Sequence, residues 1–133
     1  MKLTQLMLAA SLLVAAPAVI ATPATDELFA RYKSEGATNF DAERGKKNWS
    51  LKNKGADGEM MACTTCHGDD LSKQGSHHET KKVIEPMAHS VNAERYTDVK
   101  KIEKWFKRNC KDAWARECTA QEKGDFLKYL LSK

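Results

Sequence analysis

The string Cys63-Thr64-Thr65-Cys66-His67 contains the residues of this chain whose types and spacing are best suited to chemistry. Two cysteines three positions apart lie on one turn of chain, so each can form a thioether with one of the two vinyl groups of a single porphyrin. The imidazole of the next residue can then bind the iron. The string predicts one covalently attached haem c, with Cys63 and Cys66 as attachment sites and His67 as the proximal iron ligand.

Three other interpretations of the two cysteines are a thioredoxin-like redox pair, a structural disulfide and half of a zinc site. A redox pair is typical of alternating strands and helices, and the sequence has no strong strand pattern. A zinc site needs further ligands at regular spacing, and His77, His78 and His89 do not form the usual pair of histidines. An export signal would favour the haem interpretation further.

The first residues match such a signal. Lys2 supplies a positive charge, residues 6–20 supply an apolar core, and the small residue Ala21 suits signal peptidase. We therefore predict a signal peptide over residues 1–21 and a periplasmic location. A membrane anchor is the alternative, but the apolar run contains Pro17 and is shorter than the ~20 residues needed to span a bilayer.

Removing 21 residues from the 133 leaves 112 residues, 22–133, with a formal charge of +3 because Lys2 is lost. This length predicts one small domain, with no membrane span in the mature form. A charge of +3 without a recognition motif gives little support to nucleic-acid binding.

The four cysteines of an exported chain are expected to be engaged. If Cys63 and Cys66 take the haem, Cys110 and Cys118 remain and can pair. Two free thiols are the alternative.

The segments around the haem string have helical patterns. We expect a helix over residues 26–35 and a second helix that Asp41 caps. Gly45 and Trp49 lie one turn apart on the second helix, and a small residue beside a large one invites close packing by another helix. Residues 52–59 contain two glycines and read as a loop leading to the haem.

The second half of the chain also predicts helices. After a polar stretch, a helix starts near Thr97 or Asp98, and Thr119 to Glu122 match the capping box of a last helix. The first of these helices has one apolar and one basic side. Its apolar side carries Val99, Ile102, Trp105 and Phe106. The whole pattern predicts an all-α fold.

The residue on the other axial side of the iron decides the chemistry. A strong ligand makes a closed electron carrier, whereas a weak ligand leaves the iron open to oxygen or nitric oxide. The candidates are Met60, Met61, Met87, His77, His78, His89 and Asn109. Met60 and Met61 stand too close to the haem cysteines to reach the opposite face, whereas Met87 and His89 are sterically feasible. Asn109 projects from an apolar helix face, where its amide needs a partner, and the end of its helix is the simplest one.

Several stretches of the chain together form a specific pattern, namely residues 41–45, 63–68, 95–98, 103–105, 108–110, 117–119 and 122–123. With these stretches, the chain resembles the sphaeroides haem protein (SHP) family of high-spin monohaem c-type cytochromes, over essentially the whole mature length. The chain is also similar to cytochrome c″, in which a histidine precedes the first disulfide cysteine. The resemblance implies a small class I cytochrome c-like fold around one haem, in which Gly45 and Trp49 meet the last helix near Tyr129 and Leu130.

In the SHP family, the residue before the first disulfide cysteine is an asparagine that binds ferric iron weakly and leaves on reduction. The matching residue here is Asn109, and the resemblance also implies a Cys110–Cys118 disulfide. It argues against Met87 and His89, because the family offers no consistent ligand there. An amide oxygen is a hard, weak donor, which suits ferric iron better than ferrous iron.

We therefore expect a periplasmic haem protein that accepts electrons, releases Asn109 and binds oxygen or nitric oxide. The resemblance implies a dihaem cytochrome c as donor, and the basic face over residues 100–111 could dock an acidic partner. One alternative is an ordinary electron carrier with Met87 or His89 as a permanent ligand. Another is an enzyme that reduces oxygen or nitric oxide or consumes peroxide, for which His89 is the only candidate acid or base.

Overall fold

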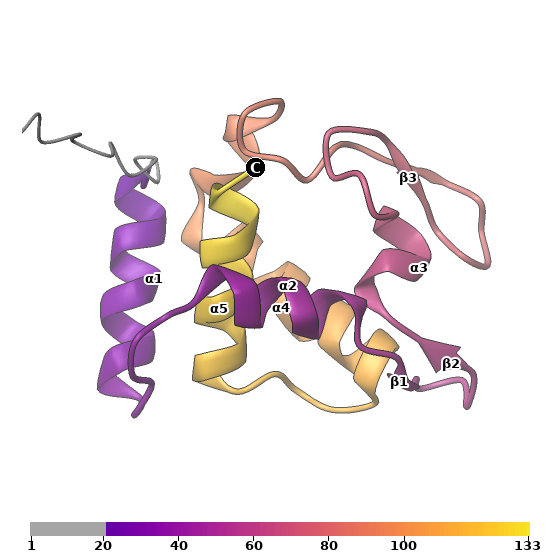
Figure 1. Cartoon of the computed structure of the whole chain (residues 1–133), viewed down its shortest axis with the longest axis horizontal. Helices are drawn as coiled ribbons and strands as arrows, with labels where there is room; N and C mark the ends of the chain where they lie inside the picture. Colours follow the sequence, from indigo (N-terminus) through magenta and orange to yellow (C-terminus); the bar gives the residue numbers. More distant parts are fainter. Residues whose placement is uncertain (1–20) are drawn as a thin grey trace, which may run out of the picture.

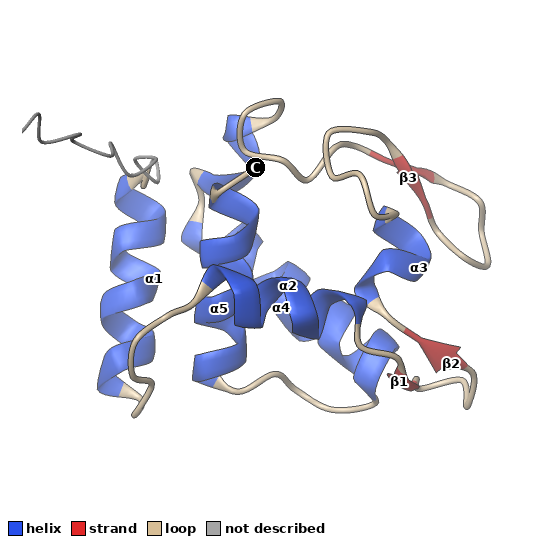
Figure 2. Ribbon diagram, viewed as in Figure 1, coloured by secondary structure: helices blue, strands red, loops and turns tan. Residues whose placement is uncertain are grey.

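The computed structural model describes residues 21–133, so the predicted signal peptide, except for Ala21, lies outside the described residues. Helices dominate the described part, and the expected all-α class is confirmed (Figures 1 and 2). The α-helices are α1 (Pro23–Ser34), α2 (Ala42–Ser50), α3 (Cys63–His67), α4 (Val99–Trp114) and α5 (Ala120–Leu131). Within residues 21–133, no helix has the length and apolar character needed to cross a membrane.

Short elements connect these helices. Two antiparallel pairs of two-residue strands flank α3, and a short 3-10 helix precedes α4 (Figure 2). These elements are β1 (Asn53–Lys54) with β2 (Met60–Met61), β3 (Gly75–Ser76) with β4 (Val83–Ile84), and η1 (Ala93–Tyr96). The pairs shape the two connections that lead into and away from α3.

Helices α2 and α5 cross at close range, as expected from Gly45 and Trp49 (Figure 1). A Cβ atom on Gly45 would lie 2.1 Å from the backbone oxygen of Asp125 and 2.9 Å from the Cβ of Tyr129. Trp49 packs edge-on against Tyr129, with ring centroids 6.2 Å apart. The absence of a side chain at Gly45 therefore allows the approach that the aromatic contacts then stabilise.

A buried carboxylate fixes the same crossing. Asp125 is only 1% exposed, and its Oδ1 accepts hydrogen bonds from Arg44 Nη2 at 2.7 Å and from the backbone N–H of Asp41 at 2.8 Å. Asp41 also caps α2, because its side chain accepts from the backbone N–H of Arg44 at 2.7 Å. The start of α2 is thus tied to the middle of α5.

Helix α1 stands beside α5 and reaches α4 through a polar contact (Figure 1). The hydroxyl of Tyr32 donates to the carboxylate of Glu103 on α4, and Lys123 Nζ on α5 lies 2.9 Å from Glu103 Oε2. Three helices therefore meet at one carboxylate.

Two helix boundaries differ from the sequence-based expectation. Helix α1 starts at Pro23 instead of Asp26, because Thr22 caps it and proline suits the first helical turn. Helix α4 continues to Trp114, and the next residue, Ala115, caps it in a left-handed conformation with a φ of 54°. Asn109 is consequently inside the helix, so the alternative of a role at the helix end is wrong.

Candidate haem site

The predicted haem string forms the short helix α3. The hydroxyl of Thr65 accepts a hydrogen bond from the backbone N–H of Ala62 at 3.0 Å, and Gly68, with a φ of 70°, ends the helix. A Cβ atom on Gly75 would lie 2.2 Å from the backbone oxygen of Cys66, so β3 packs directly on α3. The sequence alone did not reveal this role of Thr65.

The imidazole of His67 is buried at the C-terminal end of α3. It is 9% exposed, and its ring centroid lies 5.3 Å from that of Trp49 on α2. Burial, with a smaller contribution from the positive charge of Arg95, lowers the pKa of His67 to about 4. The ring is therefore neutral at ordinary pH, which is the form that binds a metal.

Cys63 and Cys66 both line the cavity that His67 lines. Burial raises the pKa of the Cys63 thiol to about 12. Neither cysteine is in a disulfide, so the alternative of a structural disulfide between them does not agree with the structure.

The cavity has a volume of about 780 Å³ and lies between α3, α4 and α5. Most of its wall is apolar or aromatic, as expected for a large planar cofactor. Residues on this wall include Trp49, Ile102, Trp105, Phe106, Trp114, Phe126, Leu127 and Leu130. Three buried nitrogens on the wall, Trp49 Nε1, His67 Nδ1 and Trp114 Nε1, have no hydrogen-bond partner within residues 21–133. The volume, the apolar wall, the two thiols and the neutral imidazole together fit one covalently attached haem.

Asn109 lies on the same cavity, contributed by α4 instead of α3. The next residue, Cys110, is joined to Cys118 by a disulfide with a Cα–Cα distance of 5.6 Å. Both cysteines are buried, and the bond ties α4 to the segment before α5. The structure thus brings Asn109 and His67, 42 positions apart, to one cavity.

The other candidate axial ligands differ in whether they line the cavity. Met61, Met87, His77 and His78 line the cavity. Met60 is 60% exposed and does not line it. His89 is buried, packs against Tyr96 with ring centroids 5.8 Å apart, and is also absent from the cavity wall. The structure therefore disfavours His89, whereas Met87, His77 and His78 all remain geometric alternatives to Asn109.

Sequence reasoning did not place Arg95 at the cavity, and it named His77 and His78 only as candidate axial ligands. Arg95 lines the cavity, and its guanidinium donates to the backbone oxygens of Pro86 and Glu85 at 2.9 and 2.8 Å. His77 and His78 are partly buried, although their polar surroundings suggest surface histidines. The spacing of Arg95 or His78 from the haem string gives no sign that the fold brings them to it.

Comparisons with known proteins agree with this architecture. A family described as a domain of unknown function (DUF1924) matches residues 35–130. The chain is 36% identical over 123 residues to cytochrome c-type protein SHP from Cereibacter sphaeroides. The matched region covers 92% of this chain and 95% of that protein. It is 36% identical over 89 residues to cytochrome c″ from Methylophilus methylotrophus, covering 67% of this chain and 62% of that protein.

Solved structures give the same relationship. Oxidised SHP, described as an oxygen-binding cytochrome c, superposes with a TM-score of 0.75 at 36% identity, covering 82% of this chain and 96% of that one. Oxidised cytochrome c″ from Methylophilus methylotrophus gives a TM-score of 0.70 at 30% identity, covering 81% and 93%. The chain therefore belongs to the SHP family of monohaem c-type cytochromes, whose cofactor is one covalently bound haem c.

Proposed function

We propose that this protein is a periplasmic cytochrome that accepts an electron from a partner cytochrome and binds oxygen or nitric oxide when it is reduced. Cys63 and Cys66 would hold the haem, His67 would be the permanent iron ligand, and Asn109 the labile one. One observation carries the proposal: Asn109 lines the same cavity as the three residues of the haem string. The description of SHP as an oxygen-binding cytochrome supports it.

The chemistry that the haem supplies is reversible one-electron transfer at an iron that can take a further ligand. The protein supplies ligands of unequal strength. Imidazole binds iron in either oxidation state, whereas a neutral amide oxygen favours the harder ferric ion. Helix α4 and the adjacent disulfide hold the backbone of Asn109, so that the side chain alone has to move.

The outer face of α4 suits an acidic electron donor. Its exposed cations are Lys100, Lys101, Lys104, Lys107, Arg108 and Lys111. Within residues 21–133, Arg108 is the member of this face that forms an ion pair, at 3.8 Å to Asp112. Positive charge of this density speeds association with an acidic protein. By resemblance to the SHP family, we propose a dihaem cytochrome c as that donor.

An ordinary electron carrier is the second candidate, because Met87 also lines the cavity. A thioether would remain bound in both oxidation states and exclude external ligands. An enzyme that reduces oxygen or nitric oxide would need a proton donor at the cavity. His89, the candidate from the sequence, does not line the cavity, whereas His77 and His78 do.

Absorption spectra of the purified holoprotein test the proposal. We expect a ferrous form that is high-spin without added ligand and becomes low-spin with nitric oxide. Asn109→Ala should change the ferric spectrum by removing the sixth ligand, whereas Met87→Ala should leave it unchanged. A ferrous wild-type protein that is six-coordinate and low-spin without added ligand would exclude Asn109 as a labile ligand and favour Met87.

A further inference from the structure

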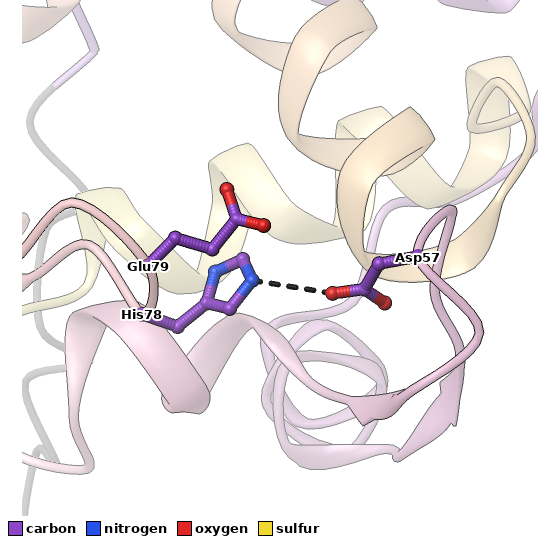
Figure 3. Close-up of side chains that lie close together, drawn as sticks. All are labelled: Asp57, His78 and Glu79. Carbon is purple, nitrogen blue, oxygen red and sulfur yellow. Dashed lines mark hydrogen bonds and ion pairs between the residues drawn. The ribbon is translucent and has the colours of Figure 1, made fainter.

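Asp57, His78 and Glu79 lie close together (Figure 3), and all three line the haem cavity. Asp57 stands on the turn between β1 and β2, whereas His78 and Glu79 stand on the connection between β3 and β4. One ligand atom from each residue lies within 4.8 Å of the others. Figure 3 shows the His78 ring facing Asp57, with the Glu79 carboxylate beside it.

The spacing of these atoms matches a metal centre. His78 Nε2 and Asp57 Oδ2 are 3.3 Å apart. Two ligand atoms each about 2.1 Å from a tetrahedral zinc ion lie about 3.4 Å from one another. The pair therefore already has the separation of two zinc ligands, and a carboxylate oxygen of the exposed Glu79 lies within 4.8 Å of both atoms.

Two of the ligands are held in place by the fold. The Asp57 turn is fixed to α4, because the backbone N–H of Ala56 donates to the Asp112 carbonyl at 3.0 Å. The His78 ring stacks on His77, with centroids 5.0 Å apart, and its Nδ1 lies 3.7 Å from Cys66 Sγ. With Nδ1 facing a sulfur, Nε2 is the ring nitrogen that faces the carboxylates.

The charge of the cluster also favours a cation. It contains two carboxylates and one imidazole, and within residues 21–133 no lysine or arginine forms an ion pair with Asp57 or Glu79. Lys81 follows the cluster in sequence, and its Nζ donates to the backbone oxygen of His78 at 2.6 Å.

We propose that Asp57, His78 and Glu79 form a binding site for a divalent transition metal ion such as Zn²⁺, with water as the remaining ligand. The imidazole distinguishes the site from a purely acidic surface cluster and selects such metals over Mg²⁺. The ion would replace the proton between His78 and Asp57 and join the two connections that flank α3. The three residues line the haem cavity but are not the iron ligands of the proposed function, and the metal site does not depend on that function.

Calorimetric titration of the tag-free, chelator-treated holoprotein with Zn²⁺ tests the proposal. We expect one Zn²⁺ per chain, and His78→Ala or Asp57→Asn should weaken binding at least ~tenfold. Glu79→Gln should weaken it in the same direction. Glu59→Gln is the matched control, because it removes one carboxylate from the same turn outside the cluster, and it should bind Zn²⁺ like the wild type.

Three results would overturn the site. They are the absence of saturable Zn²⁺ binding, equal binding by the wild type and His78→Ala, and equal affinity for Mg²⁺ and Zn²⁺. Unchanged haem absorption and circular dichroism in each variant show that the fold is intact. Added Zn²⁺ should also raise the unfolding temperature of the wild type but not that of His78→Ala.

Discussion

At Gly45 the backbones of α2 and α5 meet so closely that no side chain fits. The nearest atom to an added Cβ is a backbone oxygen of Asp125, which cannot rotate away as a flexible side chain could. We expect Gly45→Ala to reduce the free energy of unfolding by about 2 kcal/mol or more, because the helices must separate. Urea unfolding of the holoprotein, followed by haem absorption, measures this loss.

The control for this prediction is Lys46→Ala, one position along α2 at an exposed site. It should change the free energy of unfolding by less than about 0.5 kcal/mol. Equal stability of Gly45→Ala and the wild type would show that the two helices do not pack as closely as described.

Single residues also show what the sequence could and could not predict at the site. Cys63, Cys66 and His67 are adjacent in sequence, so their spacing alone indicated a haem. Asn109 was predicted as an iron ligand only by resemblance to a family, because its position on an apolar helix face is equally consistent with a role at a helix end. His78 and Asp57 come together across 21 positions, through two turns whose packing no local pattern specifies.

At the scale of elements, the Cys110–Cys118 disulfide joins α4 to the start of α5. It closes a loop with a sequence separation of 8, for which the chain-entropy estimate of the stabilisation is about 2 to 3 kcal/mol. We expect the double variant Cys110→Ser, Cys118→Ser to lose about this much stability in denaturant unfolding. A midpoint equal to that of the wild type would mean that the cross-link does not restrict the unfolded chain.

Glu103 links α1, α4 and α5 and should make folding sensitive to acid. Burial raises its pKa, but the hydrogen bond from Tyr32 and the ammonium of Lys123 outweigh burial and hold the pKa below its usual value. The unfolded chain, with a Glu pKa of about 4.3, therefore binds protons more readily than the folded chain. The resulting stability is present above about pH 4.3 and is lost as the pH falls through the lower folded pKa.

Glu103→Gln should therefore be less stable than the wild type at pH 7 and should lose less stability on acidification. Thermal unfolding between neutral pH and about pH 3 measures both effects. Glu94→Gln, at an exposed position of η1, should retain the acid sensitivity of the wild type. If Glu103→Gln retains it as well, the three-helix contact does not contribute to the acid response.

Helix caps were the most predictable feature of the elements. Asp41, Asp98 and the Thr119–Glu122 box each start a helix where the sequence places it, because capping depends on residues within one turn. The end of α4 was less predictable, since helix propensity says little about a disulfide-linked turn. The strand pairs contain two residues per strand, which is too short for any alternation to show.

For the whole molecule, the sequence predicted the helices and the haem but not the arrangement of the aromatic side chains around it. All three tryptophans of the chain, Trp49, Trp105 and Trp114, line the haem cavity. They come from α2 and from two separate turns of α4, and Trp105 is 46% exposed whereas the other two are buried. A haem in this cavity would therefore lie close to every tryptophan, and a porphyrin accepts excitation energy from tryptophan over such distances.

We consequently expect the folded holoprotein to show almost no tryptophan fluorescence, even though Trp105 is half exposed. Unfolding in guanidinium should restore much of the emission, because Trp105 and Trp114 then move away from the haem that Cys63 and Cys66 retain. The variant Cys63→Ala, Cys66→Ala, which cannot attach haem, supplies the unquenched reference. Trp105→Phe distinguishes the emission of the exposed tryptophan from that of the two buried ones. If the folded holoprotein fluoresces brightly and Trp105→Phe abolishes this emission, Trp105 lies away from the haem.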